Sequence, residues 1–182
     1  KEDKRLLTGR GQFAADPVPD NAAHAMFVRS LHAHARINSI DIQAALRVPG
    51  VLAVLTGSDL LADGINPIPH NPQWTGSPDV TLALRPGTRV HVTPHMPMPA
   101  ETVRFVGEPV AIVIAETVEA ATDAAALVAV DYEPLVAVAR AMDAIEPVAP
   151  RLWPECEGNV ALDAEVGDRL AADAAFAKAT HV

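Results

Sequence analysis

An unbroken apolar run, Val110 to Ala115, is the clearest feature of the hydrophobic pattern. It has the length of a strand and is rich in β-branched residues, which is typical of a strand covered on both faces. Thr117 can cap the alanine-rich segment that follows, whose apolar positions fall roughly on one side of a helix. Residues 128–132 then alternate between apolar and polar positions, as a second strand would. The pattern therefore predicts a strand–helix–strand core over about residues 104–138.

A helix between two strands favours a parallel pair, joined by a right-handed crossover with the helix lying on the sheet. Three more strands are predicted before this core. Their apolar or alternating runs are Ala22 to Arg29, Ile37 to Ile42 and Val51 to Thr56. These runs indicate a domain that mixes helices and strands.

Short helices are predicted between these strands. Asp41 can cap one over residues 42–48, which Pro49-Gly50 would end. Ser58 can cap a single helical turn that opens directly after the strand ending at Thr56. Helices this short must be stabilised by packing on the sheet rather than by their own hydrogen bonds.

Residues 63–100 form a proline-rich insert, because eight of the sixteen prolines of the chain lie there. Each proline removes a backbone donor and fixes φ, so the insert excludes long helices. Residues 88–92 alternate and predict one short strand within it. A connection of this length is either a functional loop or a surface that packs on something else. The sequence does not choose between a substrate entrance and an interface.

Both ends of the chain are predicted to be mainly connecting segments with little regular structure. Residues 1–21 form an extended entry segment, and residues 147–182 form an exit segment whose last helix is capped by Asp168. The chain does not begin with Met, and an extended pattern starts just after that helix. We therefore expect residues 1–182 to be a single domain taken from a longer polypeptide. Such a domain would fold alone and expose an apolar patch where the rest of the polypeptide sits.

Composition narrows the class of protein. The 182 residues are 49% apolar, which is ample for a core, but only 4% aromatic. The net charge of −9 argues against binding to a nucleic acid backbone, which needs clustered Lys and Arg. The longest apolar run is far below the ~20 residues of a membrane span. We expect a soluble, cytoplasmic protein that binds no nucleic acid and has no membrane span.

A glycine-containing motif and the single cysteine are weak candidates for a cofactor-binding site and a catalytic nucleophile, respectively. Residues 9–14 match the dinucleotide fingerprint G-x-G-x-x-A, but the fingerprint needs a buried strand before it and a helix after it. Basic residues precede this stretch and Asp16-Pro17 follows it, so a flexible turn is the better interpretation. Cys156, the only cysteine, has acidic neighbours that disfavour its thiolate, which makes it a poor nucleophile.

Titratable side chains offer two further candidates. His24, His32 and His34 lie close in sequence, yet a metal site needs fixed geometry and supporting carboxylates that the pattern does not supply. Glu108, directly before the buried strand, could be a perturbed acid or base, but more simply it closes a turn and pairs with Arg104 or a backbone amide. We assign no catalytic, cofactor-binding or metal-binding residue from the sequence.

Seven short motifs follow one another in a characteristic order. They are Thr8-Gly9-Arg10-Gly11-Gln12-Phe13, Ser30-Leu31-His32-Ala33, Val48-Pro49-Gly50-Val51, Val54-Leu55-Thr56-Gly57-Ser58-Asp59, Val106-Gly107-Glu108-Pro109-Val110-Ala111, Val130-Asp131-Tyr132-Glu133-Pro134-Leu135 and Gly167-Asp168. In this order they resemble the xanthine dehydrogenase / aldehyde oxidase family of molybdenum hydroxylases, which includes carbon monoxide dehydrogenase-like large subunits. The motifs cover most of the chain outside the proline-rich insert.

The resemblance implies an α+β fold, the α/β hammerhead that opens the molybdenum-binding large subunit. In that fold a mixed sheet and short packing helices surround the strand–helix–strand core. The family hydroxylates its substrates with oxygen from water at a molybdenum–molybdopterin centre, and electrons leave through [2Fe–2S] clusters to FAD in partner domains or subunits. The family's catalytic and pterin-binding residues lie in segments beyond Val182, so none is assigned to this chain.

The resemblance therefore implies a structural role. The domain would pack against the molybdopterin-binding domains and contact the iron–sulfur and FAD subunits or domains, while the isolated chain would be inactive and bind no cofactor. Two alternatives stay open at this point. One is a stand-alone, non-catalytic binding module of the same fold. The other is a small α/β enzyme that uses Glu108 and the histidines His24, His32 and His34.

Overall fold

The computed structural model describes residues 3–12, 19–70 and 82–181. The N-terminal half contains α1 (Asp3–Leu7), β1 (His24–Arg29), β2 (Ala35–Asp41), a 3-10 turn η1 (Ala45–Arg47), β3 (Val51–Thr56), α2 (Gly57–Ala62) and β4 (Leu82–Leu84). The C-terminal half contains β5 (Thr102–Val103), β6 (Pro109–Ala115), α3 (Val118–Ala126), β7 (Ala129–Pro134), α4 (Ala141–Ala144), a 3-10 turn η2 (Glu157–Asn159), β8 (Ala164–Val166) and α5 (Arg169–Lys178). None of the helices among these residues has the length and apolar character needed to cross a membrane.

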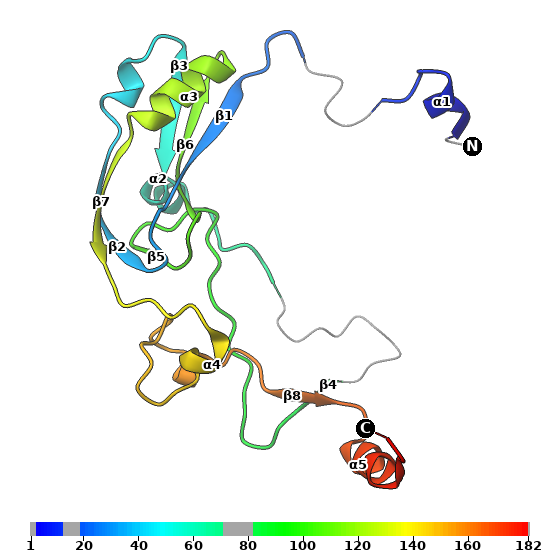
Figure 1. Ribbon diagram of the computed structural model, residues 1–182. Helices are drawn as coiled ribbons and strands as arrows, with labels where there is room; N and C mark the ends of the chain where they lie inside the picture. Colours follow the sequence, from blue (N-terminus) through cyan, green and yellow to red (C-terminus); the bar gives the residue numbers. More distant parts are fainter. Residues whose placement is uncertain (1–2, 13–18, 71–81, 182) are drawn as a thin grey trace.

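The strands of the described residues form two three-stranded sheets and one two-stranded ribbon (Figure 1). The first sheet has the order β1-β6-β3, the second β5-β2-β7, and the ribbon pairs β4 with β8. Every pair among the described strands is antiparallel. The predicted mixture of helices and strands is confirmed, but the sheets are antiparallel rather than mixed.

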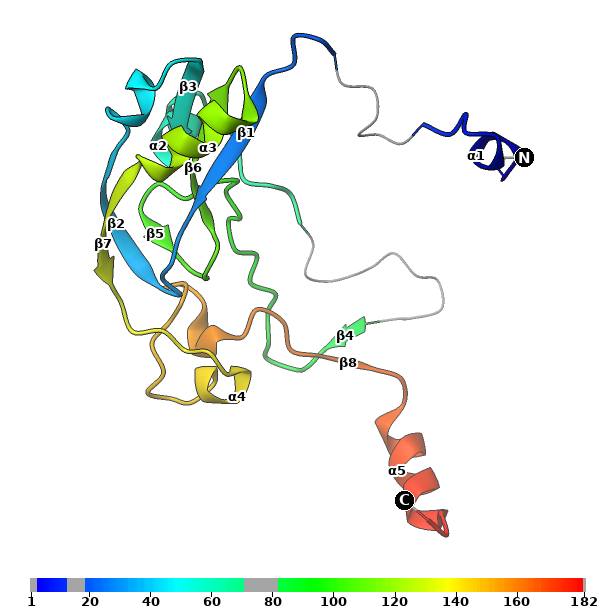
Figure 2. The same ribbon diagram turned by 45° about the horizontal axis from the view of Figure 1, so that its top comes forward.

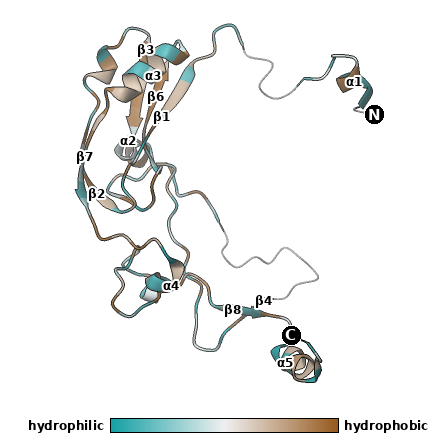
Figure 3. Cartoon of the chain, in the orientation of Figure 1, coloured by the Kyte–Doolittle hydropathy of each residue, from teal (hydrophilic) through white to brown (hydrophobic). Residues whose placement is uncertain are grey.

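Strand β6 lies at the centre of the first sheet and is the most buried element. Its side chains alternate between the two faces of the sheet, and both faces are covered, as the apolar run predicted. Val113 packs on one side with Val54, Ala45 and Ala124. Val110 packs on the other side with Ala35 and Val103. One strand therefore contributes to both hydrophobic clusters, and Figure 3 shows hydrophobic residues along this sheet.

Strand β7 does not pair with β6, so the prediction of a parallel pair with a right-handed crossover is wrong. The two edges of β6 are already occupied by β1 and β3. After α3, the chain instead pairs β7 antiparallel with β2, with Ile40 opposite Val130 and Ile37 opposite Tyr132. Figures 1 and 2 both show β2 and β7 side by side, away from β6. The elements of the core were predicted correctly, but their pairing was not.

Two predicted helix caps are confirmed. The hydroxyl of Thr117 accepts a hydrogen bond from the backbone N–H of Ala120 at 3.1 Å, which starts α3. The carboxylate of Asp168 accepts one from the backbone N–H of Ala171 at 3.0 Å, which starts α5. Each side chain satisfies one of the amide groups that a helix leaves without a partner at its N-terminus.

The helices after β2 and β3 differ from the prediction. The predicted helix over residues 42–48 is reduced to the turn η1, which begins at Ala45 and has no side-chain cap. Asp41 Oδ1 accepts from the backbone N–H of Gln43 at 2.9 Å and closes a turn before it. Helix α2 is capped by Thr56, not by Ser58. The carboxylate of Asp59 accepts from the backbone N–H and from the hydroxyl of Thr56, both at 2.7 Å, and these bonds lower the pKa of Asp59.

The described residues of the proline-rich insert form no long helix, as predicted, but the short strand was predicted at the wrong residues. Residues 88–92 are not a strand, whereas residues 82–84 form β4 and pair with β8. Gly87 has a φ of +83°, and the Thr88 hydroxyl donates to the carbonyl of Arg85 at 2.7 Å. This turn ends β4 and interrupts the alternating pattern. Residues 71–81 of the insert lie outside the described residues.

The end of the insert is packed tightly onto the start of α2. A Cβ on Gly57 would lie 2.3 Å from the carbonyl oxygen of Pro99 and 2.7 Å from the amide nitrogen of Ala100. Real Cβ atoms do not approach backbone atoms this closely. Met98, just before this contact, is 3% exposed. A glycine is therefore required at position 57, because any side chain there would push residues 99–100 of the insert away from the start of α2. This contact holds the end of the insert beside β3 of the first sheet.

We predict that Gly57→Ala destabilises the fold, because the added methyl group must push two backbone segments apart. Overpacking of this kind costs roughly 1–3 kcal/mol. Urea unfolding followed by circular dichroism measures the change. Ser58→Ala is the matched control; it removes an exposed hydroxyl that caps nothing and should leave the midpoint unchanged. Equal midpoints for the two variants would contradict the close packing.

Candidate functional site

A five-residue turn, Arg104 to Glu108, leads directly into β6. Gly107 has a φ of +89°, which only glycine adopts readily. Its backbone N–H donates to the carbonyl of Ser30 at 2.8 Å, and the N–H of Ser30 donates to the carbonyl of Glu108 at 2.9 Å. Arg29 adds a side-chain hydrogen bond to the carbonyl of Gly107 at 2.9 Å. The turn is thus held against the loop that follows β1.

Glu108 closes this turn. Its Oε2 accepts a hydrogen bond from the backbone N–H of Arg104, so the simpler of the two interpretations of this carboxylate is confirmed. Desolvation raises the pKa of Glu108, and the hydrogen bond and charge of Arg104 oppose the rise. Tyr132 lies close enough to be affected; the pKa of its hydroxyl is raised mainly by burial and in addition by the Glu108 carboxylate.

The three histidines are not brought together. His24 begins β1 opposite Ala115, at the end of β6 that is remote from Glu108. His32 and His34 follow the other end of β1. The ring of His32 lies 4.9 Å from that of Tyr132, and Nδ1 of His34 lies 2.9 Å from the carbonyl oxygen of Val136. Over residues 3–12, 19–70 and 82–181, no group of three His, Cys, Asp or Glu side chains has a geometry that could hold a metal ion.

The other two sequence candidates have structural explanations. Helix α1 precedes Gly9 where a dinucleotide site needs a buried strand, and Ala14 of that motif lies outside the described residues. Cys156 is 4% exposed. Burial raises the pKa of its thiol, although Arg151 opposes this, so burial rather than acidic neighbours makes it a poor nucleophile.

A stack of Arg104 on Trp153 is the main feature that the sequence did not reveal. The guanidinium carbon lies 3.6 Å from the centroid of the indole ring. The same guanidinium donates to the carbonyls of Thr102 at 3.0 Å and Leu152 at 3.3 Å. Burial lowers the pKa of Arg104, and Glu108 opposes this. A planar cation suits such a stack, which here ties the exit segment to the turn before β6.

Asn159 organises the exit segment around this stack. Its side-chain amide donates to the carbonyls of Ala144 at 2.9 Å and Pro150 at 3.0 Å. Its carbonyl oxygen accepts from the backbone N–H of Leu152 at 2.8 Å. One polar side chain therefore links three parts of a loop that has little regular structure, and it holds Trp153 in place to meet Arg104.

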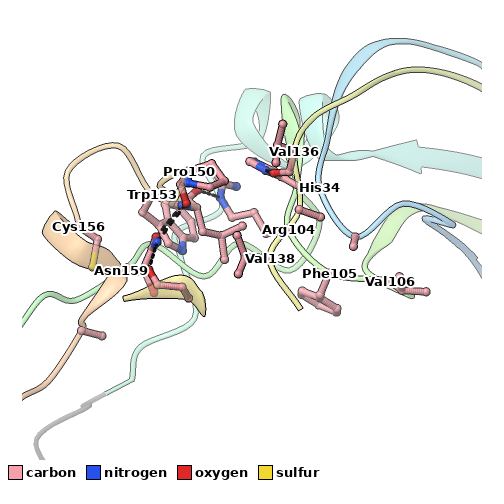
Figure 4. Close-up of a pocket in the computed structure, with 16 residues that line it drawn as sticks. His34, Arg104, Phe105, Val106, Val136, Val138, Pro150, Trp153, Cys156 and Asn159 are labelled. Carbon is pink, nitrogen blue, oxygen red and sulfur yellow. Dashed lines mark hydrogen bonds between the residues drawn. The ribbon is translucent and has the colours of Figure 1, made fainter. Parts of the chain in front are cut away.

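Two cavities adjoin the stack, of about 440 Å³ and about 430 Å³. Arg104, Phe105, Leu152 and Trp153 line both of them. The larger cavity, called the exit groove here, lies between the turn before β6, residues 136–138 and the exit segment (Figure 4). Apart from Arg104 and His34, its lining holds no charged or basic side chain. The smaller cavity also contains His95, Glu101 and Glu108.

The exit groove can recognise an apolar surface. The Glu108 carboxylate accepts a backbone hydrogen bond and shares the smaller cavity with His95, whereas His24, the first of the candidate histidines, lies at the far end of β6. The exit groove is wide, apolar and anchored by a stacked arginine. No single sequence signal reveals it, because Arg104 and Trp153 are far apart along the chain.

We predict that Glu108→Gln makes folding stability less dependent on pH. Because the pKa of Glu108 is raised in the folded state, the folded protein holds this proton more tightly than the unfolded chain. Stability therefore falls as pH rises above the ordinary value of 4.5 towards the raised pKa, and the loss persists at higher pH. Glutamine keeps an oxygen acceptor for the Arg104 N–H and does not titrate.

Urea unfolding between pH 4 and 8 tests this prediction. The fall in stability with rising pH should be smaller in the Gln variant than in the parent chain. Glu133→Gln, which removes an exposed carboxylate paired with Arg36 at 3.0 Å, corrects for the change in net charge. Parallel profiles for the parent and Glu108→Gln would contradict the assignment.

We also predict that Arg104→Lys loosens the exit segment without unfolding β6. Lysine keeps the charge but loses the planar stack on Trp153 and cannot reproduce the forked hydrogen bonds. Amide exchange over residues 150–160 should become several-fold faster, while exchange in β6 should not change. Arg140→Lys, at a side chain that is 78% exposed, is the control. Unchanged exchange over residues 150–160 would show that the stack does not hold this segment.

Comparison with known proteins agrees with the fold described above. Residues 8–136 match the family model described as "Aldehyde oxidase and xanthine dehydrogenase, a/b hammerhead domain". The chain is 36% identical to the carbon monoxide dehydrogenase large chain of Afipia carboxidovorans, covering all of this chain and 22% of that protein. It is 38% identical to the nicotine 6-hydroxylase large subunit of Paenarthrobacter nicotinovorans, covering all of this chain and 20% of that protein.

Among solved structures, the carbon monoxide dehydrogenase from Oligotropha carboxidovorans matches with a TM-score of 0.71 and 32% identity. The match covers 99% of this chain and 22% of that one. This chain therefore spans about a fifth of the length of the curated relatives it matches. The predicted α+β hammerhead fold and the predicted family are confirmed, and the alternative of a stand-alone module is not favoured. The chain belongs to the aldehyde oxidase and xanthine dehydrogenase family, and residues 8–136 are its a/b hammerhead domain.

Proposed function

We propose that this chain is a structural and assembly domain, which packs against the molybdopterin-binding domains of its own large subunit. The observation that carries the proposal is the apolar surface that the exit segment presents. Large apolar side chains that are exposed together mark surfaces that other parts of a protein cover. Several large apolar side chains of this segment are exposed, and what covers them is the subject of the proposal.

Helix α5 supports the proposal most directly. None of its ten residues is buried, and Leu170 and Phe176 are 82% and 61% exposed. Figures 1 and 2 both show it apart from the two sheets. An isolated helix below roughly 12–15 residues is marginal in water, because nucleation costs more than a few hydrogen bonds return. The helix therefore needs packing partners that the described residues of this chain do not provide.

The whole enzyme is part of the same proposal. It would be a cytoplasmic molybdenum-dependent hydroxylase with molybdenum–molybdopterin in the remaining large-subunit domains, and [2Fe–2S] clusters and FAD in partner domains or subunits. The residues of this chain do not fit an iron–sulfur cluster, because a cluster needs several thiolates and the chain has one cysteine. Its own contribution would be to hold the neighbouring domains in position. Within residues 1–182, the entry segment 1–21, the insert 63–100 and the exit segment 147–182 would supply these contacts.

We predict that the pair Leu170→Asp and Phe176→Asp, introduced into the full-length large subunit, lowers the yield of assembled enzyme several-fold. The charges would be placed in an interface that excludes water. Size-exclusion chromatography with molybdenum analysis of the peak measures the yield. Val118→Asp is the control, since Val118 is exposed in the first turn of α3, where an acidic residue is favourable. Normal yield from the double variant would count against the proposed role.

A further inference from the structure

Three loops place large apolar side chains at one end of the two sheets. The loop after β1 carries Leu31, the turn before β6 carries Phe105 and Val106, and the segment after β7 carries Val136. Their exposed fractions are 87%, 47%, 64% and 71%, respectively. We call these four residues the loop-end patch. Single exposed apolar residues are ordinary on a protein surface, but four from three adjoining loops are not.

The backbone of the loop-end patch is held in place before any partner binds. Gly107 and Ser30 join the first two loops through hydrogen bonds of 2.8 and 2.9 Å. The N–H of Leu135 donates to the carbonyl of His34 at 2.9 Å, and the carbonyl of Val136 lies 2.9 Å from the His34 ring. These bonds tie the third loop to the first. A surface that is ordered in advance loses little conformational entropy on binding, which favours its use as an interface.

The exit groove continues this surface inwards. Phe105, Val106 and Val136 belong to both the loop-end patch and the groove lining, and Val138 extends the apolar wall (Figure 4). Leu152 also lines the groove. The one permanent charge in the lining, Arg104, already has two carbonyl acceptors and a stacked indole. The groove therefore offers apolar contact with little unsatisfied polarity. Its ligand should be apolar too, since burial of a charge there would have no partner.

We propose that the loop-end patch and the exit groove receive an apolar segment from the remaining part of the same large subunit. The inference rests on the proposed function and deepens it by locating one contact surface. The carbon monoxide dehydrogenase chain that matches 99% of this sequence is a single polypeptide in which this region is 22% of the length. In that arrangement the segment is tethered, so its effective concentration is high and a modest apolar surface suffices. A membrane surface is a poorer occupant, because the chain has a net charge of −9.

Cysteine labelling in the full-length large subunit tests the inference. Val106→Cys, Val136→Cys, Leu170→Cys and Val118→Cys are made singly, and a thiol reagent is applied to the native subunit. Mass spectrometry of the peptide that carries each new cysteine gives its labelling rate. Cysteines at positions 106 and 136 should react at least tenfold more slowly than the one at 118, and all should react alike after denaturation. The native Cys156 is buried and serves as an internal reference.

The four positions separate the two proposals. If positions 106 and 136 react as fast as 118 while 170 is protected, the domain packs through α5, and the loop-end patch is not an interface. If 106, 136 and 170 all react as fast as 118, the structural role fails as well. If positions 106 and 136 are protected at high protein concentration but react as fast as 118 after dilution, the occupant is a second copy of the chain. That result would overturn the inference.

Discussion

Burial of β6 on both faces and along both edges is the constraint on which the rest of the structure depends. Val110 and Val113 are fully buried on opposite faces, and each removes apolar surface worth roughly 1.5 kcal/mol or more from water. Because β1 and β3 fill its edges, every later element must pack around β6 rather than beside it. Helix α3 covers one face through Ala124, whose small side chain permits close approach. The second sheet covers the other face through Ala35 and Val103.

The turn before β6 links this buried strand to residues on the molecular surface and fixes their positions. Gly107 and Glu108 fix the backbone where the buried strand begins, and Arg104 then reaches out to Trp153 in the exit segment. The apolar side chains of Phe105 and Val106 lie between these anchors, so they are presented in a defined position even though they are exposed. The Glu108 carboxylate closes this turn, and burial at the turn raises its pKa.

Local interactions were predictable from the sequence where one side chain meets the backbone a few residues away. Thr117 and Asp168 cap their helices as expected, and Glu108 closes its turn. Prediction failed where two alternative local hydrogen-bonding arrangements are compatible with the same residues. Thr56 and Ser58 are both hydroxyl residues at the start of α2, and only the carboxylate of Asp59 decides between them. Asp41 forms a turn with Gln43, and the 3-10 turn that follows begins only at Ala45.

The sequence by itself determined the family, the buried strand and most strand positions, because hydrophobic periodicity and ordered motifs are properties of neighbouring residues. Only the tertiary structure decided which strands pair. The periodicity of β7 is equally suited to β6 or β2, and occupation of both edges of β6 excludes the first. Tertiary structure likewise separated His24 from His32 and His34, and it brought Arg104 to Trp153 and Leu31 to the turn before β6. Contacts between residues so distant along the chain depend on the closure of the whole fold, which no local pattern contains.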